Sequence, residues 1–326
     1  MPTGNQAVRL SILFLTCISF LSAQEEELLA HFRADVDMVL LTFTVTDSKG
    51  KYANELKLGD FRIREDGVNQ KIVAFAQGTK SSFQLADVPA AAFAGTKVFI
   101  LFDTSNWMYT GFPYASDAVA EFVRRLDRTD SIAVYKFSRN LFRAVSLTRD
   151  RDQALSGIRS AVAGDDTALY NTLLLTLRDA AKVAGRKAIV VFSNGPDNAS
   201  IVAPNDVGGV AEDEGIPIYI VSTHEAQKDP LTANAFEFLA ARTGGQLFWA
   251  PTWRKEAEAF MAICENLASV YTVAYYPALS SNQSFRKISV AVVSDAGRKY
   301  RVRTRAGYHF RRRSRGSSEV TTAPAR

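Results

Sequence analysis

Lys97-Val98-Phe99-Ile100-Leu101-Phe102-Asp103 is an almost continuous apolar run that ends in a carboxylate. Such a run is typical of a strand that is covered on both faces, as in a parallel sheet. Ala188-Ile189-Val190-Val191-Phe192 is a second run of this kind. Between and beyond them we expect strands at 131–137, 142–147, 216–221 and 246–249, and helices at 115–126, 151–162, 168–184, 205–214, 231–242 and 254–268. The alternation of strands and helices over residues 97–270 therefore predicts an α/β domain with a doubly wound, mostly parallel, Rossmann-like sheet.

The segments on either side of this domain have the alternating pattern of antiparallel strands. Residues 35–77 contain a hairpin signal at Glu65-Asp66-Gly67, and residues 271–310 contain another at Asp295-Ala296-Gly297. Neither segment has enough strands to be stable alone. We therefore predict that both form one smaller β-sandwich and that the α/β domain is inserted between its parts. Residues 78–96, rich in Ala, Ser and Gly, are predicted to be a linker.

The first 23 residues have the pattern of a secretory signal peptide. A basic start that ends at Arg9 precedes an apolar run at 10–21, and small residues follow at Ser22 and Ala23. We expect cleavage near Ala23, which predicts a secreted or periplasmic protein with no membrane span after signal cleavage. An uncleaved anchor is the alternative, since Leu21 is a poor residue three places before that cut.

Charge and composition exclude several classes of protein. The chain has 326 residues and a formal net charge of +5, to which residues 1–23 contribute +1 and the tail 311–326 contributes +4. The remaining body is neutral, which argues against a nucleic-acid binder. The basic tail is predicted to be disordered and able to touch anionic surfaces. Three histidines and two cysteines exclude a multi-cysteine metal site and a disulfide framework.

Hard oxygen donors follow the predicted strands at one edge of the parallel sheet. Asp103 and Ser105 end the first apolar run, Asp166-Thr167 precedes a helix, and Asn194 and Asp197 follow the second run. Ligands of such sheets bind at the carboxyl ends of the strands. Carboxylate and hydroxyl oxygens suit Mg²⁺ better than a soft metal.

These loops resemble those of a von Willebrand factor type A (VWFA) domain, which has the integrin-I-like fold. The flanking segments resemble the acidobacterial-type VWFA-related secreted proteins over roughly residues 35–310. The motifs that carry this finer resemblance are Val45-Thr46-Asp47, Lys49-Gly50, Asp60-Phe61, Glu65-Asp66-Gly67, Gln70-Lys71-Ile72, Tyr275-Tyr276-Pro277, Phe285-Arg286-Lys287-Ile288 and Gly307-Tyr308. The resemblance implies a cell-adhesion or protein-binding role at the loop edge.

The family's metal-ion-dependent adhesion site (MIDAS) carries Asp-x-Ser-x-Ser, Thr and Asp on three loops. Asp103, Ser105 and Thr167 match this pattern, whereas Trp107 stands at the second serine and Asn194 at the last aspartate. The resemblance thus implies a degenerate site, because a hydroxyl ligand and a negative charge are lost. Asp166 would return a carboxylate nearby.

Two interpretations of this site compete. In the first, which we favour, it is a relic: Ser105 and Thr167 satisfy backbone donors, Asp103 bonds among them, and no cofactor is needed. In the second, Asp103, Ser105 and Thr167 hold Mg²⁺ weakly, with an open position for a partner, and Asn194 and Asp166 are further candidate ligands.

The predicted function is a secreted, non-enzymatic interaction or adhesion module whose partner is a protein or a surface polymer. Four aromatic residues in or beside the first loop are candidates for a partner-binding rim: Trp107, Tyr109, Phe112 and Tyr114. A metal-dependent (Mg²⁺) adhesion protein is the alternative. A hydrolase that uses Asp103 and Asp197 as paired carboxylates is a weaker one, since no nucleophile and base accompany them.

Overall fold

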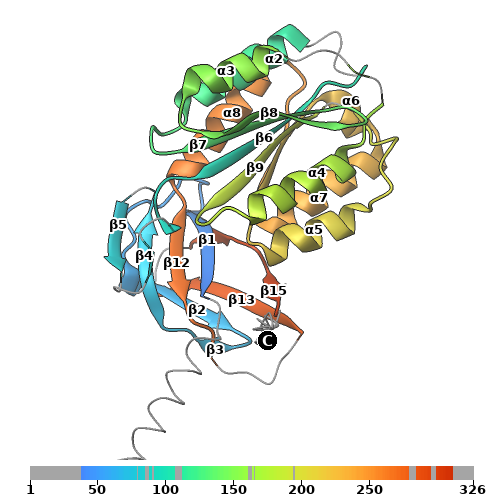
Figure 1. Cartoon of the computed structure of the whole chain (residues 1–326). Coiled ribbons are helices and arrows are strands. Elements are labelled where there is room, and N and C mark those ends of the chain that lie inside the picture. Colours follow the sequence, from blue (N-terminus) through green and yellow to red (C-terminus); the bar gives the residue numbers. More distant parts are fainter. Residues whose placement is uncertain are drawn as a thin grey trace, which may run out of the picture. The chain divides into compact units, whose positions relative to one another are not determined.

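The computed structural model describes residues 38–78, 80–84, 88–89, 92–106, 112–160, 164, 166–193, 195–278, 284–294 and 299–310. Within Val39–Phe310 the described strands form three sheets of six, five and four strands. Figure 1 shows the helices gathered around the six-stranded sheet and the other two sheets together beside it. The predicted signal peptide 1–23 and basic tail 311–326 lie outside the described residues. Among the residues that are described, no helix has the length and apolarity needed to cross a membrane.

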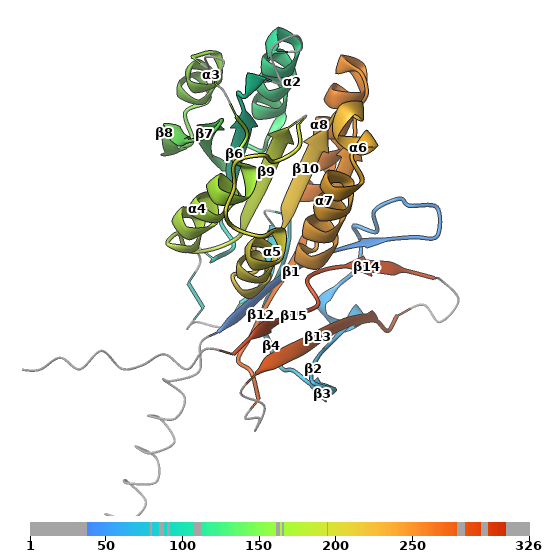
Figure 2. The same ribbon diagram turned by 90° about the vertical axis from the view of Figure 1, so that its right-hand side faces the viewer.

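The six-stranded sheet has the order β11-β10-β9-β6-β7-β8 and is parallel except for the edge strand β8. Its strands are β6 (Lys97–Asp103), β7 (Ser131–Phe137), β8 (Leu141–Thr148), β9 (Lys187–Ser193), β10 (Ile218–Ser222) and β11 (Leu247–Trp249). One face packs against α2 (Phe112–Arg125), α3 (Arg151–Arg159) and α8 (Trp253–Ala268). The other packs against α4 (Leu169–Ala181), α5 (Pro204–Asp213) and α7 (Pro230–Thr243), as Figure 2 shows, with the short α6 (His224–Lys228) before α7. The predicted doubly wound fold is confirmed.

Helices cover both faces of β6, which explains why its sequence is an almost continuous apolar run. Val98, Ile100 and Phe102 belong to the core under α2 and α8, whereas Phe99 and Leu101 belong to the core under α4. All five side chains are at most 2% exposed. A strand that buries both faces has no position for a polar side chain, so alternation disappears.

Helix ends are fixed by local side chains. The carboxylates of Asp150 and Asp229 accept hydrogen bonds from the first backbone N–H groups of α3 and α7, and the Thr252 hydroxyl does so for α8. Gly244 ends α7 with a left-handed φ of 78°, a conformation that favours glycine. α7 and α8 follow the carboxyl ends of β10 and β11, so these caps fix where the two helices begin at that edge of the sheet.

The two β segments interleave as predicted. The five-stranded sheet has the order β14-β1-β12-β4-β5, with β1 (Val39–Thr46), β4 (Ile72–Gln77), β5 (Lys80–Gln84), β12 (Tyr271–Tyr275) and β14 (Arg301–Arg303). The four-stranded sheet has the order β15-β13-β2-β3, with β2 (Phe61–Glu65), β3 (Val68–Asn69), β13 (Phe285–Val292) and β15 (Gly307–His309); a short 3-10 helix, η1 (Leu58–Asp60), precedes β2. Strands from before and after the α/β domain therefore share both sheets, and their apolar faces form one core.

One prediction for this region is wrong in detail. Residues 78–96 were expected to be a linker, but Lys80–Gln84 forms β5, which pairs with β4. The segment after it also packs inward, since Val88 and Phe93 are buried. This edge strand forms because its neighbour offers unpaired backbone hydrogen-bonding groups. A composition rich in Ala, Ser and Gly does not indicate such pairing.

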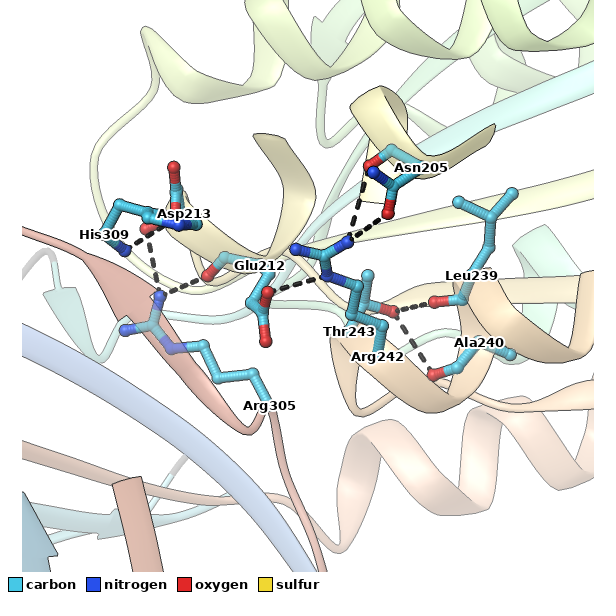
Figure 3. A network of polar contacts seen from close by, with 9 residues as sticks. All are labelled: Asn205, Glu212, Asp213, Leu239, Ala240, Arg242, Thr243, Arg305 and His309. Carbon is cyan, nitrogen blue, oxygen red and sulfur yellow. Dashed lines mark hydrogen bonds and ion pairs between the residues drawn. The ribbon is translucent and has the colours of Figure 1, made fainter. Parts of the chain in front are cut away.

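Buried polar side chains join the sandwich to the α/β domain. The Arg186 guanidinium donates to the Gly78 carbonyl at 2.7 Å, and that of Arg305 donates to the Glu212 carbonyl at 2.7 Å. Figure 3 shows the latter contact at the end of α5, where the Glu212 carboxylate also pairs with Arg242. The contacts of Arg186 and Arg305 join residues that are far apart in the sequence, and they hold the α/β domain against the sandwich.

Candidate functional site

The candidate site is built around Asp103, the last residue of β6. Its carboxylate is 0% exposed. Oδ1 accepts a hydrogen bond from the Ser105 backbone N–H at 2.8 Å, and Oδ2 accepts one from the Ser193 hydroxyl at 2.5 Å. Burial raises the pKa of Asp103, and the donors from Ser193 and Ser105 only partly offset that effect. Both oxygens are thus used, yet no cationic side chain is bonded to them among the described residues.

A second serine supports the first from the neighbouring strand. The Ser222 hydroxyl, at the end of β10, donates to the Ser193 carbonyl at 2.6 Å. Three adjacent parallel strands, β6, β9 and β10, are therefore linked through their last residues. Sequence reasoning gave no role to Ser193 or Ser222; the available signal was that each directly ends a buried strand.

Thr167 on the second loop is also completely buried. Its backbone N–H donates to Asn198 Oδ1 at 2.9 Å, and its carbonyl accepts from the backbone N–H groups of Asn198 and Ala199. The second and third loops are therefore fastened to each other. Asp166 beside it forms an ion pair with Arg139 and accepts from the Asn198 amide at 3.3 Å.

The two matching hydroxyl groups are unsatisfied. Ser105 Oγ and Thr167 Oγ1 are buried, and neither makes a hydrogen bond in the part of the chain that the structure describes. The Ser105 hydroxyl lies close enough to lower the pKa of Asp103, but its geometry is not that of a hydrogen bond. The relic interpretation expected both hydroxyls to bond to backbone donors, and they do not. Buried polar atoms without partners are rare, and a ligand is one explanation for them.

The donor set can be tested against Mg²⁺ on these observations. Asp103 supplies a carboxylate, and Ser105 and Thr167 supply two free hydroxyl oxygens, which are hard ligands. No group of three His, Cys, Asp or Glu side chains with metal-site geometry occurs in the described ranges. The residues therefore fit a weak Mg²⁺ site with a single carboxylate rather than a strong one.

Asp197 has a different role from Asp103. Its Oδ2 accepts from the Tyr170 backbone N–H at 2.9 Å, in the first turn of α4, and its Oδ1 accepts from the N–H groups of Ala199 and Ser200. A carboxylate with three backbone donors at a helix start is a capping group. Its charge contributes to the raised pKa of Asp103.

Much of the predicted aromatic rim lies outside the described residues. Trp107 and Tyr109 are among those not described, as is the MIDAS position Asn194. The backbone of Phe112 begins α2. Tyr114 is described, and it is 61% exposed in the first turn of the same helix.

Three further apolar side chains stand exposed at this edge. Ile201, in the connection from β9 to α5, is 94% exposed; Leu231, in the first turn of α7, is 82% exposed; and Trp253, which begins α8, is 55% exposed. Together with Tyr114 they follow the carboxyl ends of β6, β9, β10 and β11, so they surround the edge from both faces of the sheet. We call these four residues the apolar rim. Sequence reasoning missed three of them, although each is an apolar residue that directly follows a predicted strand and its loop.

Comparison with known proteins agrees with this geometry. Residues 98–196 match the family model of the von Willebrand factor type A domain. The chain contains a VWA domain. No curated protein matches the chain. The narrower likeness to acidobacterial-type secreted proteins stays a prediction.

Solved structures resemble the VWA domain and its surroundings at low identity. The vWF domain of the type V pili tip protein Mfa5 from Porphyromonas gingivalis is 13% identical, covering 53% of this chain and 95% of that one, with a TM-score of 0.47. A von Willebrand factor type A protein from Catenulispora acidiphila is 12% identical, covering 83% and 74%, with a TM-score of 0.46. Proximal thread matrix protein 1 from the mussel byssus, with a zinc-occupied MIDAS motif, is 15% identical, covering 54% and 48%, with a TM-score of 0.46.

Proposed function

We propose that the VWA domain is a non-enzymatic interaction module that binds a protein or a surface polymer at its loop edge. The observation that carries this proposal is the apolar rim, since four large side chains with 55–94% exposure follow the carboxyl ends of four strands, at the edge where such folds bind ligands. Exposed apolar groups that gather in one place mark interaction surfaces. The sandwich, tied to the opposite end of the domain, would orient this edge.

Metal would have a minor part in this binding. The family pattern implies that Asp103, Ser105 and Thr167 would hold Mg²⁺, and that the ion would supply an open coordination position to a carboxylate of the partner. Only one carboxylate of the motif is present, because Asn194 replaces the other aspartate. With Asp103 already accepting two internal hydrogen bonds, the attraction for a divalent cation is weakened.

A metal-dependent adhesion protein is the second candidate. It is favoured by the two buried hydroxyl groups without partners, Ser105 Oγ and Thr167 Oγ1, which a cation would satisfy. A hydrolase has less support. Asp197 is occupied as a helix cap, and Asp103 is buried with both oxygens bonded, so neither carboxylate is placed to receive a proton from a substrate.

The test is a binding measurement with immobilised protein and native cell-envelope extract, with and without EDTA. Leu231→Glu and Trp253→Glu place charges in the apolar rim and should each weaken capture at least about fivefold. Val68→Glu is the matched control, because Val68 is 55% exposed but lies on β3 in the sandwich. Equal capture by all four proteins would refute the loop edge as the binding surface.

The EDTA arm separates the two candidates. Capture that survives EDTA supports the metal-independent module. Capture lost with EDTA, together with a Mg²⁺-dependent rise in melting temperature that Asp103→Ala abolishes, supports metal-dependent adhesion. In the first case, Asn194→Asp with Trp107→Ser should create a Mg²⁺-dependent rise by returning a carboxylate and a hydroxyl.

Export to the periplasm or the cell exterior is part of the proposal and rests on the leader sequence. N-terminal sequencing of the exported protein should begin at or near Gln24. Recovery of the full-length chain in membranes would instead show that residues 10–21 anchor it.

A further inference from the structure

A second surface of the VWA chain has the chemistry of a binding site. A groove of about 1000 Å³ runs beside β14. Its lining includes Arg301, Arg303 and Arg305 on one segment, Glu237 in the middle of α7, and Gly245 in the turn before β11. Because β11 starts where parallel β6 starts, the groove lies toward the amino edge of the sheet, opposite Asp103. In Figure 2, β14 lies just below the helices α7 and α8.

The groove has unbalanced positive charge. Arg301, Arg303 and Arg305 recur at every second position, and Glu237 is the only acidic residue among the described lining residues. Arg301 and Arg303 are exposed. None of the three guanidinium groups forms an ion pair with a described carboxylate; Arg303 donates to the Gly245 carbonyl at 3.0 Å. Glu212 and Asp213 lie near Arg305, so the uncompensated positive charge is that of Arg301 and Arg303, and it attracts an anionic ligand.

Arg305 gives a second, independent indication. It is 7% exposed, and within the described chain its hydrogen bonds go to backbone carbonyls: Nη1 to Glu212 and Asp213, and Nη2 to Leu40. The guanidinium also lies over the Tyr308 ring. Figure 3 shows its contact with the end of α5. Its Nε is buried without an acceptor in the described chain. Burial lowers the pKa of Arg305, so its charge is held at a cost that a nearby anion would reduce.

The backbone beside the groove favours an extended peptide over other anions. β14 pairs with β1 through Thr44–Arg303, Val45–Val302 and Thr46–Arg301, and it ends the five-stranded sheet. Its other edge has no strand partner among the described residues, so backbone N–H and C=O groups face outward there. An extended chain can add to such an edge by main-chain hydrogen bonds, while side chains select its sequence.

We propose that the groove lined by Arg301, Arg303 and Arg305, here called the arginine groove, binds an extended acidic peptide segment of a partner protein. The peptide lies along β14, and its carboxylates pair with Arg301 and Arg303. Arg305 adds long-range attraction from beneath. This site is separate from the loop edge and does not depend on the function proposed for it.

The experiment uses the full chain and a fluorescent dodecapeptide of alternating Glu and Thr, with fluorescence anisotropy at low salt. Arg301→Glu and Arg303→Glu should each raise Kd by about fivefold or more, and rising salt should weaken binding. Arg62→Glu is the matched control, because Arg62 is an exposed strand arginine in the other sheet, and it should change Kd less than about twofold. Arg301 carries the test because its side chain is exposed and forms no hydrogen bond or ion pair with the described residues.

A second peptide tests the strand addition. N-methylation at alternate residues removes main-chain donors and should weaken binding about tenfold. Unchanged Kd in Arg301→Glu, or absence of binding at millimolar peptide, would overturn the proposal. So would equal binding of the methylated peptide, or of a sulfated polysaccharide in its place. Leu231→Glu should leave peptide binding intact, which separates this site from the apolar rim.

Discussion

Asp103 and Glu65 are both buried carboxylates, one at the loop edge of the VWA domain and one in the core of the sandwich, and they are balanced in opposite ways. Glu65 is 3% exposed; its Oε1 pairs with Arg286 at 2.9 Å, and its Oε2 accepts from the hydroxyl groups of Tyr275 and Tyr308. Asp103 is 0% exposed and accepts from a serine hydroxyl and one backbone N–H. Glu65 therefore has its own cation, Arg286, whereas no cation of the described residues is bonded to Asp103.

This difference separates a structural charge from one that can respond to a ligand. The Glu65 charge is neutralised by Arg286 inside the sandwich core. Burial and the Glu65 charge raise the pKa of Tyr275 far above its usual range, so this tyrosine stays protonated and donates to Glu65. Around Asp103 the balance has to come from a proton or from a cation in solution. The buried hydroxyl groups of Ser105 and Thr167, which have no partners in the described chain, are candidate ligands for such a cation.

Removing the internal cation should have the largest effect. Arg286→Met leaves the Glu65 carboxylate buried and unpaired, so we expect the free energy of unfolding to fall by about 3–5 kcal/mol. Urea unfolding at pH 7 measures the change. Arg62→Met, on an exposed position of β2, should change it by less than about 0.5 kcal/mol. Equal losses in both variants would show that Glu65 is not held by Arg286.

Glu256, in the first turn of α8, is another buried carboxylate that can be compared with Asp103 and Glu65. It is 9% exposed, its Oε2 has no partner in the described chain, and burial raises its pKa to about 7. The folded chain therefore holds this proton more tightly than the unfolded chain, and stability falls as the pH rises from 4.5 through about 7. Glu256→Gln should remove that loss and add about 1–2 kcal/mol at pH 8.

The matched control for this change is Glu258→Gln on the same helix. Glu258 is exposed and pairs with Lys255, so its loss should change stability by less than about 0.5 kcal/mol. Urea unfolding at pH 5 and pH 8 distinguishes the variants. A stability gain in Glu256→Gln that is equal at both pH values would contradict a titrating carboxylate.

Asp103→Asn should have the smallest effect. The raised pKa of Asp103 means that, without a bound cation, stability declines as the pH rises from its ordinary value of 3.8 through the raised one. The amide keeps one acceptor for the Ser105 N–H and can donate to Ser193, so we expect a gain of about 1 kcal/mol at pH 8 in EDTA and none at pH 3. A loss at pH 8 would mean that the ionised carboxylate is required for folding.

Much of the fold was predictable because it depends on local pattern. The runs at 97–103 and 188–192 identified β6 and β9, and the alternation around them gave the doubly wound sheet. The pairing of the two β segments followed from the need to bury a face. β5 was not predictable, because it is held in place by its neighbour β4 rather than by its own residues.

The candidate site was predictable only in part, for a related reason. The sequence predicted Asp103, Ser105 and Thr167 as site residues from their positions in the loops and from their match to the family's motif. The donation from Ser193 to Asp103, over a separation of 90 residues, and the pairing of Asp166 with Arg139 require the strand order and the loop geometry. Whether a hydroxyl group finds a partner is likewise decided by every element around it.

The sequence by itself determined which residues lie at the carboxyl ends of the buried strands, because period and polarity specify strands and their direction fixes the edge. Only the tertiary structure decided which buried charges are neutralised. Arg286 reaches Glu65 across 221 residues, whereas no described cation reaches Asp103. Electrostatic balance depends on distances of a few ångströms in a low-dielectric interior, and these exist only once the sheets are paired.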